Sequence, residues 1–142
     1  MYLAGDIMTK DLVFVGPDWS VREAIGLFVE HDVSGMPVID RHSVLRGVVT
    51  EFRLLEVLFN PQLRHCCVYD VMTHDVITVA PDTLLSDVAA ILLQHRIKRL
   101  PVVENGKVVG IVSRCDLLRY VNEVGPQLDR LVAELDHFAT SE

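Results

Sequence analysis

The chain has 142 residues, of which 50% are hydrophobic and 23% are charged, and its net charge at neutral pH is −7. This apolar content excludes an intrinsically disordered chain, and the length fits one domain or two small domains that share a core. The acidic balance argues against a nucleic-acid partner, and no apolar run approaches the roughly 20 residues that span a bilayer, so we expect no membrane partner either.

The chain contains an internal duplication. Asp6-Ile7-Met8-Thr9 recurs as Asp70-Val71-Met72-Thr73, and Gly47-Val48-Val49-Thr50 recurs as Gly110-Ile111-Val112-Ser113. A match that keeps its order over this length indicates two structural repeats. We expect a first repeat over 1–59, a connector over 60–69, a second repeat over 70–124 and an amphipathic tail over 125–142.

Each repeat predicts a strand, a helix, two strands and a second helix. In the first repeat, apolar residues spaced by three and four predict a helix over 21–29, which Ser20 can cap. The other elements of this repeat are expected at 13–15, 37–39, 44–50 and 51–59. The second repeat predicts the same elements at 77–79, 85–93, 101–103, 108–113 and 114–124. Asn105-Gly106, between its last two strands, is typical of a type I′ turn.

These elements predict an α/β (α+β) fold. One such repeat is too small to bury both faces of its strands, so we expect two β-α-β-β-α repeats, related by a pseudo-twofold axis, to form one globule. After Gly125-Pro126, leucines at helical spacing predict a C-terminal helix. That helix would either pack on its own globule or dock on a partner.

The cysteines and histidines indicate neither disulfides nor a metal site. Cys66, Cys67 and Cys115 are odd in number and lack a C-x-x-C spacing, and the histidines form no ligand cluster. Free cysteines commonly pack as small hydrophobic side chains. We therefore expect inert thiols, no bound metal and a cytoplasmic location.

Polar residues gather where the last strand of the second repeat enters the last helix. Ser113 can cap that helix, and Asp116 lies three positions further on in the same first turn. A helix start favours anions, and a carboxylate can accept two hydrogen bonds from a diol such as ribose. Lys98-Arg99 would reach the same end from the neighbouring strand. The same residues also fit an S-x-x-D capping box with solvated charges, and spacing alone leaves both interpretations open.

The duplicated order D-h-M-T, P-D, h-P-V-V and G-h-V-S-x-x-D-L resembles a pair of CBS domains (cystathionine-β-synthase domains), called a Bateman module, from about Asp6 to Val121. The resemblance implies the paired repeats predicted above. It also implies adenosine-containing ligands, commonly AMP, ADP, ATP or S-adenosylmethionine, in clefts between the repeats. Such modules usually sense a ligand and signal to a partner, so the resemblance implies no catalytic residues and no required cofactor.

In the second repeat the resemblance assigns a ligand-binding role to each matched position. Asp116 would hold the ribose diol, and Ser113 would contact ribose or phosphate beside Gly110, whose missing side chain permits close approach. Further residues would hold the phosphate (Lys98 and Arg99), line the adenine (Ile77 and Thr78) and form apolar walls (Met72, Leu100 and Pro101).

The first repeat departs from this pattern. Thr50 keeps the hydroxyl, but Arg53 stands where the carboxylate is expected, and Ser34-Gly35 replaces the basic pair. Arginine cannot accept a hydrogen bond from a diol; it would meet a phosphate or form a surface salt bridge instead. We expect one principal site in the second repeat and a weaker, altered or empty site at Thr50 and Arg53.

The sequence therefore predicts a homodimeric regulatory sensor that binds an adenosine-containing ligand and acts on an unidentified effector protein. The alternative is a dimeric interaction scaffold without a ligand. An enzyme is not expected, because the sequence has no general-base pair or metal-ligand set.

Overall fold

The computed structural model describes residues 2–62, 65–124 and 133. The chain divides into two compact units, which we call the N-terminal unit (13–76 and 105–108) and the C-terminal unit (1–12, 77–104 and 109–142). The predicted tail helix lies outside the described residues, apart from Ala133. Within the described part of the chain, no helix has the length and hydropathy needed to cross a membrane.

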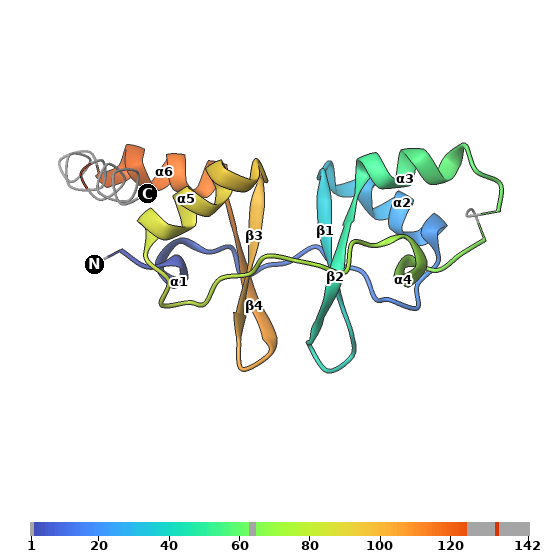
Figure 1. The fold of residues 1–142 in the computed structure, drawn as a ribbon, viewed down its shortest axis with the longest axis horizontal. Coiled ribbons are helices and arrows are strands. Elements are labelled where there is room, and N and C mark those ends of the chain that lie inside the picture. The colour runs from blue at the N-terminus through green and yellow to red at the C-terminus, as the bar shows by residue number, and fades with distance from the viewer. Residues whose placement is uncertain (1, 63–64, 125–132, 134–142) are drawn as a thin grey trace. The chain divides into compact units, whose positions relative to one another are not determined.

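The N-terminal unit contains a β-hairpin and a pair of longer helices (Figure 1). Its elements are α2 (Val21–His31), β1 (Gly35–Ile39), β2 (Leu45–Thr50), α3 (Glu51–Leu58) and α4 (Val68–Val71). The strands are antiparallel, with Gly35 opposite Thr50. The predicted cap of α2 is confirmed, because the Ser20 hydroxyl accepts a hydrogen bond from the Glu23 backbone N–H at 3.1 Å.

The C-terminal unit repeats this arrangement. Its elements are α1 (Ala4–Ile7), α5 (Leu85–His95), β3 (Arg99–Glu104), β4 (Lys107–Ser113) and α6 (Arg114–Val124). Between the strands, Asn105 and Gly106 have φ angles of 55° and 78°. Two successive positive φ values confirm the predicted turn. Two β-hairpin-and-helix repeats confirm the mixed α+β fold class.

The predicted strands at 13–15 and 77–79 are reduced to one bridging residue each. Val15 bridges Val38 and Val79 bridges Val102, both in the parallel sense. Each run is shortened at its N-terminal end, where the next ladder bond would need a backbone N–H from Pro37 or Pro101, and proline has none. The strand prediction was therefore correct in place and too long in extent.

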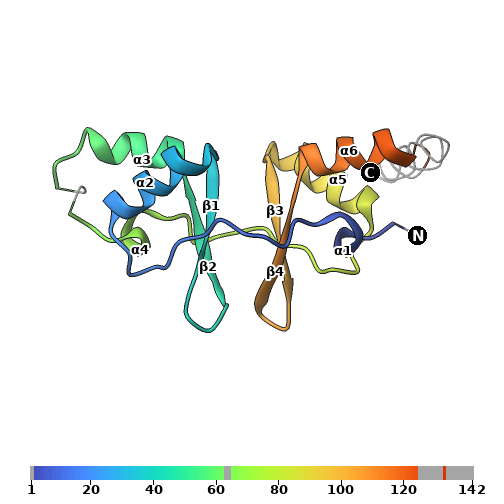
Figure 2. The same cartoon turned by 180° about the vertical axis from the view of Figure 1, so that it is seen from behind.

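The duplicated Asp-Met-Thr segments pair with the opposite repeat. Thr9 pairs with Ile111 of β4, with N···O distances of 2.8 and 2.9 Å, and Thr73 pairs with Val48 of β2, with distances of 2.8 and 3.0 Å. Figure 2 accordingly shows α1 beside α5 and α6, and α4 beside α2 and α3. The compact units therefore cross the boundaries of the sequence repeats.

Each unit has its own apolar core. Both cores use hairpin residues and the inward stripes of the helices. In the N-terminal unit the core includes Val15, Phe28, Met36, Val38, Val49 and Leu54. In the C-terminal unit it includes Ala4, Val79, Val88, Leu100, Val102 and Val112. These cores hold the hairpin and the following helix together, and so position the end of each hairpin from which α3 or α6 begins.

Candidate functional site

A reciprocal capping box forms the start of α6. The Asp116 backbone N–H donates to the Ser113 hydroxyl at 3.0 Å, and the Ser113 backbone N–H donates to Asp116 Oδ2 at 2.9 Å. The other oxygen, Oδ1, accepts from Arg119 Nη1 at 3.2 Å. Asp116 is only 8% exposed, so these contacts offset the desolvation of its carboxylate. The capping interpretation of S-x-x-D is thus confirmed.

The capping contacts leave Asp116 able to accept further hydrogen bonds. An ionised carboxylate has about four lone-pair positions, and each Asp116 oxygen uses one of them here. The box fixes the side-chain orientation, because both Ser113 and Arg119 restrain it. A preorganised acceptor of this kind is compatible with a diol ligand, so the capping and binding interpretations do not exclude each other.

The basic pair lies at the same end of the hairpin as α6. The backbone carbonyl of Lys98 accepts from the Arg114 N–H at 3.0 Å, which joins the start of β3 to the first residue of α6. The Lys98 side chain is exposed and that of Arg99 is half-buried. This backbone contact brings the basic pair to the start of α6, while the expected convergence of its charges on one cleft stays a prediction.

The residues expected to line an adenine lie at this end too. The Val79 N–H donates to the Pro101 carbonyl at 3.0 Å and the Val79 carbonyl accepts from Val103 at 2.8 Å, in a parallel sense. Ile77 and Thr78 therefore run beside the start of β3, and both are exposed. Of the three expected apolar walls, Leu100 is fully buried in the core and Pro101 is buried in the strand.

Two expected site residues have structural neighbours that the sequence analysis did not foresee. A Cβ on Gly110 would lie 2.6 Å from the Met8 sulfur, so Met8 occupies the space that the glycine leaves open. Met72 is not in this unit: it is buried in the N-terminal unit, where its sulfur would lie 2.8 Å from a Cβ on Gly47. Met8 was missed, although the shared Met and Gly positions of the two repeats were the available signal.

In the first repeat, Arg53 is held by its own unit. The Thr50 hydroxyl accepts from the Arg53 N–H at 3.2 Å, and Arg53 Nε donates to the Val71 carbonyl at 3.2 Å. Arg53 Nη1 also lies 3.7 Å from Glu56 Oε2. Arg53 therefore forms the salt bridge that was one of its two expected roles. Two of its three guanidinium nitrogens, Nε and Nη1, are engaged in these contacts, which leaves fewer donors for a phosphate.

The two equivalent helix starts differ in charge. Around Asp116 the C-terminal unit carries four cationic residues: Lys98, Arg99, Arg114 and Arg119. The matching positions of the N-terminal unit carry none: they are Ser34, Gly35, Glu51 and Glu56. With Asp116 and Arg53 also counted, positive charge is in excess at the first end and negative charge at the second, so the first end is the more favourable one for an anionic ligand.

The described residues contain no group of three or more His, Cys, Asp or Glu side chains that could hold a metal ion. The thiols of Cys66, Cys67 and Cys115 are free. Cys67 Sγ donates to Asp70 Oδ2 at 3.2 Å, a contact that belongs to the start of α4.

Comparison with known proteins gives consistent matches. The family model "CBS domain" matches residues 4–60 and 68–123. The CBS domain-containing protein YhcV of Bacillus subtilis is 33% identical over 114 residues, which are 79% of this chain and 80% of that protein. The chain spans 40% of Methanocaldococcus jannaschii MJ1232 and 23% of the inosine-5′-monophosphate dehydrogenase of that organism.

Solved structures agree with these matches. A crystal structure of CBSX2 in complex with AMP has a TM-score of 0.81 and 37% identity, and the match covers 88% of this chain and 99% of that one. The CBS domain pair of MJ0100, in complex with 5′-methylthioadenosine and S-adenosyl-L-methionine, has a TM-score of 0.75 and 27% identity, with coverage of 87% and 98%.

Proposed function

Because the chain belongs to the CBS-domain family, we propose that it is a regulatory module that binds an adenosine-containing ligand at the start of α6. The observation that carries this proposal is Asp116, a carboxylate nine-tenths buried and oriented by Ser113, with four cationic residues at the same end of the unit. Such an end combines an acceptor for a sugar diol with donors for an anion.

The proposal gives each residue a role. Asp116 accepts hydrogen bonds from the ribose hydroxyls, and Ser113 contacts the ribose or the first phosphate. Lys98 and Arg99 balance the phosphate charge, and the backbone at Ile77 and Thr78 meets the base edge. Gly110, Leu100 and Pro101 support the site within the C-terminal unit, and Met72 is buried in the N-terminal unit. The Thr50 and Arg53 end stays a weaker or empty site.

The charge of this end favours a phosphate-bearing ligand. Among ligands named for similar structures, AMP carries a phosphate and S-adenosylmethionine carries a sulfonium cation. Cations around Asp116 attract the first and repel the second, since charges within a few ångströms interact strongly. We therefore expect AMP, ADP or ATP to bind more tightly than S-adenosylmethionine, with no further cofactor.

We propose that the ligand acts by differential binding rather than by reaction. A ligand shifts a conformational equilibrium only by its difference in affinity for the two states. The receiver of that shift would be another protein, and the chain itself would be a cytoplasmic homodimer without catalytic activity. Nucleotide recovered unchanged after long incubation is the expected result for such a module.

Adenine nucleotides are expected to stabilise the folded protein. A ligand that binds only the folded state adds about 2.7 kcal/mol to the free energy of unfolding at 100 times its Kd. The measurement is thermal unfolding with AMP, ADP, ATP, S-adenosylmethionine and, as a control for the base, GMP. A rise in Tm with adenine nucleotides and none with GMP supports the proposal.

The alternative scaffold function is supported by the exposed side chains of α3. Phe52 and Leu55 of this helix and Phe59, its C-cap residue, are exposed, and exposed aromatic residues favour protein contacts. A scaffold would self-associate and would not change its Tm with any of the ligands above. That result would overturn the sensor proposal and favour the scaffold.

A further inference from the structure

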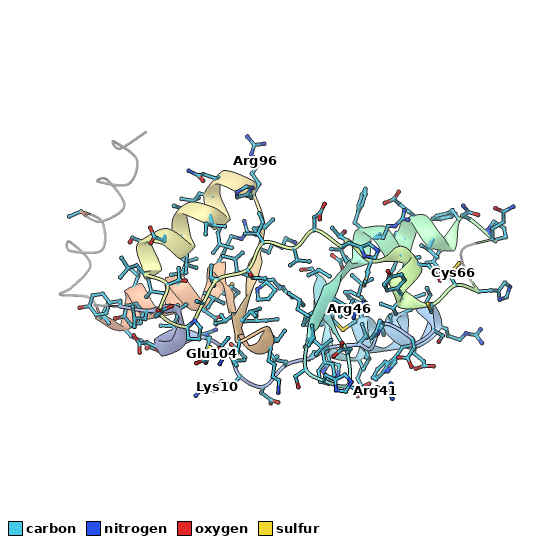
Figure 3. All side chains as sticks on the ribbon, turned by 60° about the horizontal axis from the view of Figure 1, so that its bottom comes forward. Lys10, Arg41, Arg46, Cys66, Arg96 and Glu104 are labelled. Carbon is cyan, nitrogen blue, oxygen red and sulfur yellow. The ribbon has the colours of Figure 1, made fainter. Side chains whose placement is uncertain are left out.

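Two exposed aromatic residues lie together where the chain enters α2 and α4 of the N-terminal unit. Trp19 is 37% exposed, and Tyr69, in α4, is 44% exposed. The Trp19 carbonyl accepts from the Val68 N–H at 2.8 Å, and the Pro17 carbonyl accepts from the Tyr69 N–H at 2.9 Å. Cys66, which Figure 3 shows beside α4, accepts from the first N–H of α2 at 3.4 Å. These backbone contacts bring both aromatic residues to one junction of the unit.

The C-terminal unit has the same junction without aromatic side chains. In the duplication, Thr83 is equivalent to Trp19 and Gly5 is equivalent to Tyr69. The Gly5 N–H donates to a proline carbonyl at 2.8 Å, as the Tyr69 N–H does. The Thr83 hydroxyl accepts from the Ala80 N–H at 2.9 Å and so closes its own turn. Because threonine and glycine satisfy this junction, the local fold does not by itself require tryptophan and tyrosine there.

An acidic side chain accompanies the indole of Trp19. A Cβ on Gly16 would lie 2.6 Å from Trp19 Nε1 and 3.1 Å from Asp18 Oδ1, so the indole edge and the carboxylate converge beside the Gly16 backbone. Asp18 is exposed and takes part in none of the ion pairs formed within the described residues. Negative charge is in excess over 16–23 and 67–71, whose charged residues are Asp18, Arg22, Glu23 and Asp70.

Both rings are held by their neighbours. The Tyr69 ring makes an edge contact with His74, with ring centroids 5.0 Å apart and an interplanar angle of 85°. The Trp19 ring lies over Gly16, where a larger residue would displace it. Side chains that are already restrained lose less conformational entropy when a partner binds. The junction therefore presents two restrained aromatic rings next to an exposed carboxylate.

We propose that Asp18, Trp19 and Tyr69, which we call the aromatic-acidic surface, bind an arginine-bearing basic segment of the protein that receives the signal. Aromatic faces attract cations, and a guanidinium group both stacks on a ring and pairs with a carboxylate. An acidic segment or a nucleic acid would instead meet like charge. The inference rests on the regulatory role proposed above, because it names the chemistry of the receiver, and it uses no residue of the nucleotide site.

A model peptide tests the binding of a basic segment. The probe is a fluorescein-labelled peptide of repeated Gly-Ser-Arg units, which is titrated with the full chain at low ionic strength and followed by fluorescence anisotropy. The same peptide with glutamine in place of arginine should not bind. Trp19 is the only tryptophan of the chain, so a change in its emission with the unlabelled arginine peptide reports the contact directly.

Substitutions separate the aromatic contact from the net charge. Trp19→Thr introduces the residue of the equivalent junction and should weaken binding by about tenfold, because it removes the cation–π contact. Tyr69→Ala should act in the same direction. Asp18→Asn should weaken binding by about threefold, since an exposed ion pair contributes less. Asp82→Asn, at the equivalent exposed position of the C-terminal unit, changes the net charge by the same amount and should have no effect. Urea denaturation checks that each variant is folded.

Two results would overturn the inference. If the arginine peptide neither binds nor changes the Trp19 emission, the surface does not recognise a basic segment. If Asp18→Asn and Asp82→Asn weaken binding equally and Trp19→Thr leaves it unchanged, the attraction comes from the net charge of the chain. Failure of the proposed function is distinguishable, because it is judged by nucleotide titration. Trp19→Thr should bind AMP as the wild type does, and a wild type that binds no adenosine compound rejects the nucleotide site whatever the peptide does.

Discussion

Replacing Asp116 with alanine is expected to weaken the binding of AMP, ADP or ATP by roughly tenfold to a hundredfold. A charge-assisted hydrogen bond contributes about 1.5–3 kcal/mol, and the side chain is already oriented by Ser113 and Arg119, so little ordering cost offsets its loss. Isothermal titration calorimetry of the wild type and Asp116→Ala measures the difference directly.

The same substitution also removes half of a capping box, so affinity must be separated from stability. Loss of a cap costs about 1 kcal/mol, and titration well below the midpoint of unfolding keeps both proteins folded. Asp116→Asn keeps an oxygen that can accept from the Ser113 N–H but loses the charge, and should have an intermediate affinity. Arg53→Ala, at the equivalent position of the first repeat, is the matched control and should leave the affinity of the principal site in the second repeat unchanged. Wild-type affinity in Asp116→Ala would reject the site.

Replacing Gly47 with alanine is expected to destabilise the N-terminal unit strongly. The new Cβ would lie 2.5 Å from the backbone oxygen of Thr73 and 2.8 Å from the Met72 sulfur. Overpacking of this kind costs about 1–3 kcal/mol, and the upper end is expected because a backbone oxygen paired with β2 must move. Urea denaturation gives the change in the free energy of unfolding.

Gly26 provides the control for Gly47. It lies on the exposed side of α2, where a Cβ would meet nothing within 4 Å. Gly26→Ala should therefore stabilise the protein by about 1 kcal/mol, because alanine has the higher helix propensity. Equal stability of Gly47→Ala and wild type would mean that the Asp70–Thr73 segment does not pack on β2.

A double substitution tests whether the Asp6–Thr9 segment of the first sequence repeat packs on β4 of the second repeat. The three atoms nearest to a Cβ at position 110 all belong to the Met8 side chain, the closest at 2.6 Å, so Gly110→Ala should cost less than Gly47→Ala. Met8→Ala should recover part of that cost, whereas Met72→Ala should not, because residues in contact couple and distant residues add. If Gly110→Ala showed the same coupling energy with Met8→Ala as with Met72→Ala, the packing of Met8 against Gly110 would be contradicted.

Local patterns predicted most of the elements because their causes are local. The helix over 21–29 and the turn at Asn105-Gly106 follow from apolar spacing and from the need for positive φ. Ser113 and Asp116 lie within one helical turn, so their capping box depends on four consecutive residues alone. The position of Lys98 beside the start of α6 could also be predicted from strand order. Lys98 directly precedes β3, and β3 pairs with β4, the strand that leads into α6.

By itself, the sequence determined the two similar repeats, their helices and hairpins, and the acidic residue with its cap at the start of the last helix. Only the tertiary structure decided which unit receives each Asp-Met-Thr segment, and hence that Met8 rather than Met72 stands beside Gly110. The physical reason is that β2 and β4 are nearly alike, and each has a glycine, Gly47 or Gly110, that leaves room for the methionine of either Asp-Met-Thr segment. Pairing of Thr9 with Ile111 and of Thr73 with Val48 is a long-range choice, and residue spacing within one repeat carries no information about it.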